Sequence, residues 1–464
     1  MTTTEHPKPD DLTWEPPGAG TWERDVSHAP AAPTRLFRRV MTDAPSTAYR
    51  AVFEDFGGPL DTIDMATVRG GLYRRVTPLV GADRGGPAPP KPILWLASRL
   101  HPAFRKRNKT ALATFNTMSY LDTLNGWEEH ERGEWIRRNQ VFQSEDLVGF
   151  DDDQLADHVE RVADHLLEGN IRHHVLHGTD MGPIGDLLAH AVRWGLDTLE
   201  VMPLLQGASP ATREAARLGA DIAAALRGDG FDPAEVSSVD EIGAAGPGSM
   251  AALDAYLVLY GWRMVTSYDI EGLTVSELPG SVVALVRAGA DGVQHDDSTV
   301  DEAAAQLRTR VPTEHLELYD QLLSGARQAY GLRDDNGPLT AEWPLGLTRR
   351  AYLEAGGRLA AAGQMSAADR VFELDTDELA SVLRGAASPS GAELDERAAH
   401  RQWEATLDPP LLLGDPPTVL DSSVLPAGLR RVTDAVLACV SMLEKEPGGK
   451  PLEGMGIGDR AYTG

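Results

Sequence analysis

Two of the charged side chains between Asp254 and Pro279 lie next to apolar and aromatic residues. Arg263 stands between Trp262 and Met264, where a plain core helix would carry an apolar residue, and Asp269 follows six residues later. Burying a charge is costly unless the charge is paired. We therefore expect Arg263 and Asp269 to be ion-pair partners or ligand contacts, and we predict catalytic roles for both.

Histidines form a second concentration of chemically useful side chains. The helix predicted from Asp151 to about Leu176 contains His158, His165, His173 and His174, and His177 follows it. His173 and His177 are four residues apart and share one helix face, a spacing that could hold a divalent metal. The intervening sequence is HHVLH and not HExxH, so a metal would need ligands from another helix.

We accordingly predict no metal site and assign acid–base roles to His173 and His177. His165 is predicted to contact the substrate. The remaining histidines are expected to be ordinary core or surface residues.

The N-terminal stretch 1–34 is rich in Pro, Gly and Thr and shows no helical period. It carries Trp14 and Trp22, which favour an arm that docks on the body of the protein over a free tail. Docking alone would explain Trp22, Asp25 and His28. The alternative is that Asp25 and His28 contribute to a site, and on that basis Trp22 and His28 are predicted to contact substrate.

A third group of candidates comprises Arg333, Trp343 and Arg349. Arg349 is predicted to lie near the N-terminus of a helix that starts at about residue 344, where the helix dipole disfavours a cation. A cation kept there suggests an anionic partner, which could be a carboxylate of this chain or an anionic group of a ligand. The competing interpretation is a solvated arginine.

Composition limits the classes of partner. The 464 residues carry a formal net charge of −27, which disfavours non-specific binding to nucleic acid or anionic lipid. Arg105, Lys106, Arg107 and Lys109 form a local basic run, interpreted as a solvated helix face. A single cysteine, the absence of a signal-peptide core and the absence of a long apolar run predict a cytoplasmic protein with no membrane partner.

Several common catalytic motifs are missing from the sequence. It contains no GxxxxGK[ST] loop, no GxGxxG after a strand, no GxSxG elbow and no CxxC pair. A standard nucleotide-binding loop on this chain is therefore not expected.

The periodicity predicts a mostly α protein with a small β element near its N-terminal end. A helix is predicted at 34–56, a hairpin near 65–80, a linker at 81–92 and a loop at 178–185. Long helices at 93–146 are expected to break near Asn125-Gly126, and a further helix is expected at about 186–200. Later helices are predicted near 302–332, 344–363, 375–385, 391–407 and 426–444.

Several segments, in this order, resemble the phosphoenolpyruvate-utilising enzymes of the rifampin phosphotransferase and phosphoenolpyruvate synthase-like group. They are PPGAGTWERDVSHAP at 16–30, RLHP at 99–102, LLQGASPAT at 204–212, YLVLYGWRMVTSYDIEGLTVSELP at 256–279, YGLRDDNGPLTAEWPLGLTRRAYLEAGGRLAAAG at 330–363, VFELDTDEL at 371–379 and GMGIGDRAYTG at 454–464. The resemblance covers the helical substrate-binding part of that family.

The resemblance implies an acceptor-binding module that holds a small, hydroxyl-bearing molecule. Arg263 and Arg349 would stabilise negative charge, and Asp269 or a histidine would act as the base. The residues expected to contact substrate are Trp22, His28, Trp262, Tyr268, His165, Arg333, Trp343 and Arg349. The implied domains are an arm and first helix at 1–50, a helical substrate-binding domain at 51–452, and the start of a swivelling domain at 453–464.

The family's ATP-grasp domain and its swivelling phospho-histidine domain have no counterpart in these motifs. ATP and magnesium are thus implied only for separate partner proteins, with no cofactor on this chain. Two other functions remain open: a stand-alone lyase, dehydratase or cyclase of secondary metabolism that uses the same pocket without ATP, and a non-catalytic ligand-binding protein.

Overall fold

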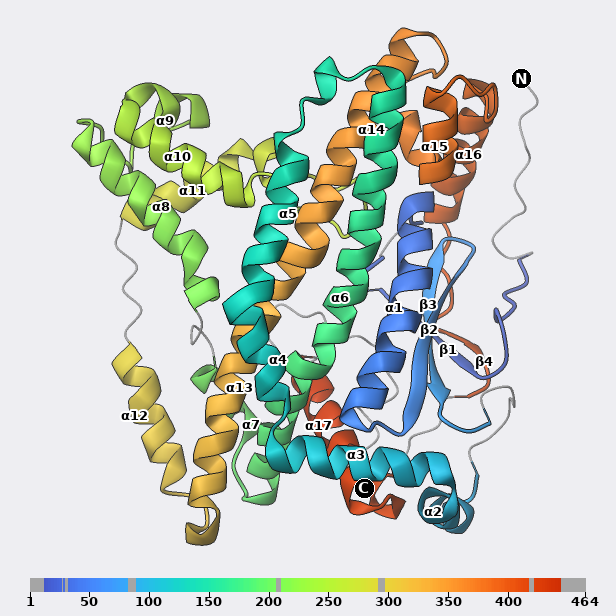
Figure 1. Ribbon diagram of the computed structural model, residues 1–464, viewed down its shortest axis with the longest axis vertical. Coiled ribbons are helices and arrows are strands. Elements are labelled where there is room, and N and C mark those ends of the chain that lie inside the picture. Colours follow the sequence, from blue (N-terminus) through green and yellow to red (C-terminus); the bar gives the residue numbers. More distant parts are fainter. Residues whose placement is uncertain are drawn as a thin grey trace.

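The computed structural model describes residues 12–26, 28–29, 32–81, 89–205, 210–290, 297–416 and 421–443. Most of these residues are helical, and a small antiparallel sheet lies beside the helices (Figure 1). The predicted fold class is therefore confirmed. The expected start of a swivelling domain at 453–464, most of the linker at 81–92 and the first part of the arm lie outside the described residues.

The sheet contains β1 (Thr21–Arg24), β2 (Leu60–Val68), β3 (Gly71–Pro78) and β4 (Leu412–Gly414), in the order β2-β3-β1-β4. The predicted hairpin is formed by β2 and β3. Its two-residue turn, Arg69-Gly70, has positive φ at both positions, as a tight hairpin turn requires. The N-terminal arm docks through β1, which pairs with β3 and β4 and buries Trp22.

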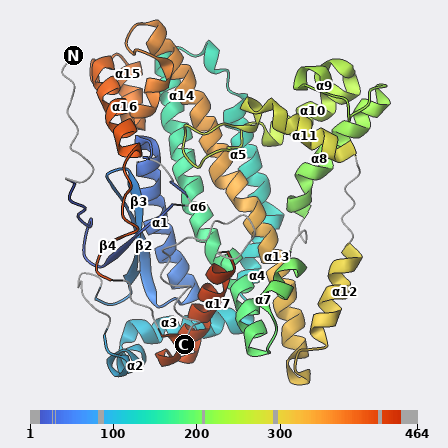
Figure 2. The same cartoon turned by 180° about the vertical axis from the view of Figure 1, so that it is seen from behind.

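Helix α6 (Asp152–Arg193) runs through the centre of the molecule (Figures 1 and 2). Asp151 caps its start together with Gln154, as the acidic sequence there predicts. The helix is continuous for 42 residues, so the predicted loop at 178–185 and the separate helix at 186–200 are wrong.

The glycines that suggested a loop instead allow neighbouring elements to approach α6 closely. A Cβ atom at Gly178 would lie 2.6 Å from the Phe56 ring, and one at Gly185 would lie 2.0 Å from the carbonyl oxygen of Ala435. Those contacts come from α1 (Arg35–Phe56) and α17 (Ala427–Leu443), both of which pack along α6.

Two further helix breaks predicted from the sequence are replaced by π-helical turns. Helix α4 (Tyr120–Gly126) continues through η2 (Trp127–Glu131) into α5 (Arg132–Ser144). Helix α13 (Leu316–Gly337) continues through η7 (Pro338–Glu342) into α14 (Trp343–Ala361). The predicted helix at 302–332 is divided instead, because α12 (Asp297–Arg308) ends before the turn at Pro312.

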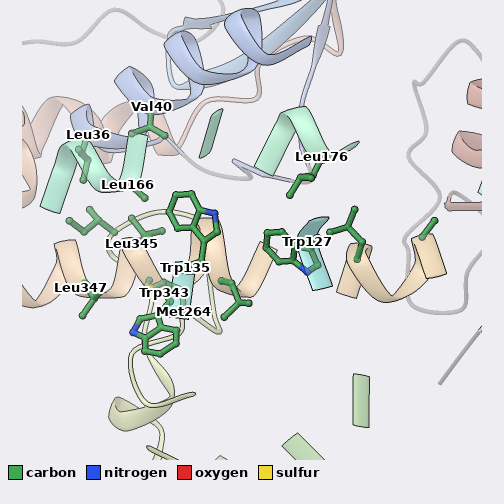
Figure 3. Packing of buried hydrophobic residues seen from close by; sticks show 14 of the residues in the cluster. Leu36, Val40, Trp127, Trp135, Leu166, Leu176, Met264, Trp343, Leu345 and Leu347 are labelled. Atoms are coloured by element: carbon green, nitrogen blue, oxygen red, sulfur yellow. The ribbon is translucent and has the colours of Figure 1, made fainter. Parts of the chain in front are cut away.

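The main core lies where α6 meets these two long helices. Trp127, Trp135 and Trp343 pack there with Leu166, Leu176, Leu345 and Met264 (Figure 3). A separate small core lies within the group formed by α8 (Pro210–Gly228), α9 (Val239–Ala245), α10 (Pro247–Tyr260) and α11 (Pro279–Ala290), which projects from one side (Figure 1).

The remaining helices are α2 (Lys91–Leu100), α3 (Pro102–Thr117), α7 (Thr198–Val201), α15 (Thr376–Leu383) and α16 (Gly391–Ala405). Helices α15, α16 and α17 lie at the predicted positions near 375–385, 391–407 and 426–444. Within the described residues, no helix combines the length and apolar character needed to cross a bilayer.

Candidate functional site

The π-helical turn η7 organises the candidate site, because different candidate residues lie near its two ends. Its backbone is held close to α6: a Cβ atom at Gly169 would lie 1.9 Å from the carbonyl oxygen of Thr340. Asn139 donates a hydrogen bond to the carbonyl oxygen of Leu339 at 2.9 Å. Since π-turns interrupt the regular helix ladder, they frequently mark functional positions.

Histidines of α6 lie at the start of η7. His173 donates from Nδ1 to the side-chain oxygen of Asn336. A Cβ atom placed on Gly337 would lie 3.4 Å from Cε1 of the His173 ring. His177 donates from Nδ1 to Oδ2 of Asp180 at 3.0 Å, and Asn336 donates to the same oxygen at 3.3 Å. The rings of His173 and His177 are 4.5 Å apart between centroids.

These hydrogen bonds determine which ring nitrogen can accept a proton. When Nδ1 of a neutral imidazole carries the hydrogen, Nε2 is the basic atom. Within the described part of the chain, Nε2 of His177 has no hydrogen-bond partner, and the side chain is 24% exposed. His177 with Asp180 therefore has the arrangement of a general base oriented by a carboxylate.

Burial keeps the neighbouring histidines neutral. It lowers the pKa of His173 well below its usual value, and the proximity of His177 and His174 lowers that pKa further. Burial also lowers the pKa of His174 to about 3, and Nδ1 of His174 donates to the carbonyl oxygen of Asn170 at 2.7 Å. Neutral rings surrounding His177 leave it as the best-placed base of the three.

The N-terminal arm adds a second histidine–carboxylate pair to this region. Nδ1 of His28 lies 2.8 Å from Oδ2 of Asp25, a carboxylate that is 6% exposed. The centroid of the His28 ring lies 5.4 Å from that of the Tyr268 ring, and the proximity of His28 contributes to lowering the pKa of His173 and His174. His28 and Tyr268 thus contact each other, and His28 lies close enough to the α6 histidines to influence them.

Glu342 lies at the other end of η7. Burial raises its pKa to about 7, while the positive charge of Arg263 acts in the opposite direction. The same carboxyl group contributes to the raised pKa of Tyr268, for which burial is the larger cause. Glu342 is five residues beyond Gly337, a span of about 8 Å at the helical rise, so the histidine end and the Arg263 end are separated by the length of a small molecule.

Arg263 is buried, with 8% of its surface exposed, yet it makes no ion pair with any carboxylate of the described residues. Its Nε donates to the carbonyl oxygen of Leu259 at 2.8 Å. The guanidinium lies 3.8 Å from the centroid of the Tyr260 ring and 5.7 Å from that of Trp343. Aromatic rings therefore hold the guanidinium while its two terminal nitrogens remain available for an anion.

Asp269 does not pair with Arg263, which corrects one of the two expectations for this segment. Its carboxylate accepts hydrogen bonds from the backbone nitrogen of Thr34 at 2.8 Å and from the Thr34 hydroxyl at 2.6 Å. Thr34 is the N-cap of α1, so Asp269 fixes the start of that helix. Burial raises the pKa of Asp269, and the hydrogen bonds from Thr34 oppose that rise.

Arg349 lies in the middle of the continuous α13–η7–α14 helix and not at a helix N-terminus. It donates to both carboxylate oxygens of Glu277 and to the carbonyl oxygen of Ile270. Of the two anionic partners considered from the sequence, the structure contains the carboxylate of this chain. Arg349 accordingly connects α14 to the 261–278 segment.

The remaining residues predicted to contact substrate pack against other side chains of the protein. His165 is stacked between Trp135 and Phe142, burial lowers its pKa to about 4, and its Nε2 lies 2.8 Å from Oδ1 of Asn139. Trp343 is fully buried and donates to Gln143.

Trp22 belongs to the sheet, where its ring packs with Tyr73 and Leu413. Trp262 is half-buried beneath the Arg350 guanidinium. Arg333 lies over the Tyr330 ring, and its Nη1 is buried without a hydrogen-bond partner in the described structure.

Sequence reasoning did not identify Glu342, Asp180, Asn336 or Tyr49 as site residues. Tyr49 of α1 stacks on His177 at 6.5 Å and meets His174 edge-on at 5.6 Å. A signal for Asp180 did exist, since it follows His177 by three residues and shares its helix face. The assumed loop at 178–185 concealed that signal.

Metal binding has no geometric support in the described ranges, which contain no group of three or more His, Cys, Asp or Glu side chains arranged to hold an ion. No protein-family model matches this chain, and no curated protein matches it.

Proposed function

We propose that this chain is the acceptor-binding module of a phosphotransferase of the phosphoenolpyruvate-utilising type. The observation that carries the proposal is the pair of side chains at the two ends of η7. His177, hydrogen-bonded to the Asp180 carboxylate, lies near one end. Arg263, which is buried and has no carboxylate partner among the described residues, lies near the other. Transfer of a phosphoryl group to a hydroxyl requires both a base for the proton and positive charge for the phosphoryl oxygens.

In this proposal a small molecule occupies the region between the two ends of η7. Its hydroxyl group lies at Nε2 of His177, which accepts the proton while Asp180 holds the ring. Arg263 binds negative charge, either of the phosphoryl group or of the acceptor molecule itself. Asp25 with His28, and Tyr268, border the same region and position the acceptor.

The phosphoryl donor belongs to partners in this account. A separate ATP-grasp protein and a separate swivelling histidine protein would supply it, and ATP and magnesium would bind to those partners. The described residues of this chain provide acceptor binding, proton removal and charge stabilisation.

A second candidate function rests on Glu342. A carboxyl group with a pKa of about 7 is suited to donate and accept protons near neutral pH. Together with His177 it could catalyse a lyase or dehydratase reaction with no ATP.

Transfer assays distinguish the candidates. The purified chain is incubated with ATP, a candidate ATP-grasp protein, a candidate swivelling histidine protein, and a panel of hydroxyl-bearing small molecules, and products are identified by mass spectrometry. Phosphorylated product that depends on all three proteins supports the proposal. Turnover by this chain alone supports the second candidate, and binding without turnover in either mixture supports a ligand-binding protein.

Substitution of His177 connects the assay to the site. His177→Asn should lower product formation by about 10²–10⁴-fold, the usual contribution of a positioned general base. His130→Asn is the matched control, because the His130 side chain is 81% exposed and lies on a different helix segment. An equal loss of product formation in both variants would mean that His177 does not act as the base.

A further inference from the structure

Helix α2 presents its apolar stripe to solvent. Ile93, Leu96 and Leu100 lie three and four residues apart and share one face. Their exposed fractions are 58%, 51% and 65%, whereas Ser98, on the opposite face, is buried. An amphipathic helix in a soluble fold normally buries its apolar stripe, so α2 has the reverse orientation.

Helices α2 and α3 together carry positive charge that the described structure does not fully neutralise. Between residues 85 and 121 the sequence contains six Lys or Arg residues and no Asp or Glu, in a chain with a net charge of −27. Arg105, Lys106 and Lys109 of α3 are exposed and make no ion pair with described residues. Lys91 and Arg107 are paired, with Asp421 and Glu54 respectively.

The position of α2 makes the stripe accessible. Both views place α2 and α3 at one end of the molecule, with α2 at the corner (Figures 1 and 2). Trp95 is 48% exposed beside the stripe, and the Arg99 guanidinium lies 4.2 Å from its ring centroid. Arg99 also donates to the carbonyl oxygen of Val424, which fixes α2 to the segment before α17.

We propose that α2 and the start of α3 form a peripheral docking surface for an anionic lipid bilayer. An outward apolar stripe, a tryptophan and flanking cations are the features by which an amphipathic helix lies in a membrane interface. The cations match anionic headgroups, and the apolar side chains enter the acyl boundary. This proposal revises the sequence-based expectations of no membrane partner and of a solvated basic face. The acidic remainder of the chain does not prevent the contact, because charges beyond about 8 Å are screened at physiological ionic strength.

Vesicle binding by the full-length chain tests the proposal. Co-sedimentation is measured with vesicles of phosphatidylcholine containing 30% phosphatidylglycerol and with vesicles of phosphatidylcholine alone. The proposal predicts binding to the anionic vesicles that weakens with added salt, and at least tenfold weaker binding to the neutral ones.

Two variants address the two components separately. I93S/L96S/L100S removes the apolar stripe and R105E/K106E reverses the charge, and each should weaken binding at least tenfold. V141S/V148S is the matched control: it removes apolar side chains that are 59% and 78% exposed elsewhere, and it should bind as the wild type does. Because all the substituted residues are exposed, unchanged circular dichroism should accompany each variant.

Absence of binding to the anionic vesicles would overturn the proposal. Equal binding by the wild type and both α2–α3 variants would overturn it as well. Neither result would bear on acceptor binding at η7, so this proposal and the proposed function fail independently.

Discussion

Arg263 and Arg349 are buried to the same extent, each with 8% of its surface exposed, but their surroundings differ. Arg349 is held by both carboxylate oxygens of Glu277 and by a backbone carbonyl. Arg263 has one backbone acceptor and two aromatic rings, and no carboxylate partner among the described residues. The difference separates a cation that stabilises the fold from one that is available to a ligand.

The contrast matters because an unpaired buried charge is costly. Arg349 offsets the cost through Glu277, whose pKa is lowered by hydrogen bonds from Arg349 although burial opposes that change. Arg263 offsets it only in part, through cation–π contacts. An anionic ligand would complete its environment.

The largest expected effect comes from breaking the Arg349 pair. Glu277→Gln leaves a buried guanidinium without its counter-ion and should lower the free energy of unfolding by about 3–5 kcal/mol in urea titrations. Glu271→Gln is the control, since Glu271 is a more exposed partner of Arg401 and should cost no more than about 1 kcal/mol. Equal losses would mean that the Arg349–Glu277 pair stabilises the fold no more than an exposed ion pair does.

A smaller effect is expected from Glu342, which would become a counter-ion for Arg263 if it ionised. Burial raises its folded-state pKa to about 7, above its ordinary value of 4.5. The folded state therefore binds this proton more tightly than the unfolded state. The resulting stabilisation is complete below about pH 4.5 and is lost as the pH rises through about 7.

Glu342→Gln should remove that pH dependence. Relative to the wild type, the variant should gain about 2 kcal/mol of unfolding free energy between pH 5 and pH 8. Glu134→Gln, at an exposed carboxylate, should leave the wild-type slope unchanged. A wild-type slope in Glu342→Gln would mean that folding does not raise the pKa of Glu342.

The smallest change concerns Asp269, which the sequence suggested as a base. Asp269→Asn retains an acceptor for Thr34 but removes the charge, and should cost about 1–2 kcal/mol of stability. Product formation in the transfer assay should stay within about twofold of the wild type. A loss of product formation comparable to that of His177→Asn would mean that Asp269 takes part in catalysis.

Local sequence signals were sufficient for much of the fold. The helical period predicted α1, α15, α16 and α17, the acidic cap predicted the start of α6, and the glycine pair Gly70-Gly71 predicted the hairpin, whose turn is at Arg69-Gly70. The errors occurred where a residue type has two uses. Gly178, Gly182 and Gly185 allow close packing against α1, α3 and α17, but in isolation glycine equally suggests a loop.

The candidate site was predicted only in part for the same reason. Residue type indicated that Arg263, His173, His177 and His28 could do chemistry, and the structure places them around η7. The partners that give Arg349 and Asp269 structural roles are distant in sequence: Glu277 is 72 residues from Arg349, and Thr34 is 235 residues from Asp269. Local periodicity contains no information about such pairs, nor about the π-turn that positions Glu342.

Binding of inorganic phosphate tests most directly whether Arg263 is an anion receptor. Isothermal titration calorimetry compares the wild type with Arg263→Met, and Arg137→Met controls for the loss of an exposed cation. We predict saturable binding by the wild type and Arg137→Met, at least tenfold weaker binding by Arg263→Met, which corresponds to about 1.4 kcal/mol, and a stability change below about 1 kcal/mol in that variant. Equal phosphate affinity in all three proteins, or no binding by the wild type, would contradict the distinction between the two arginines.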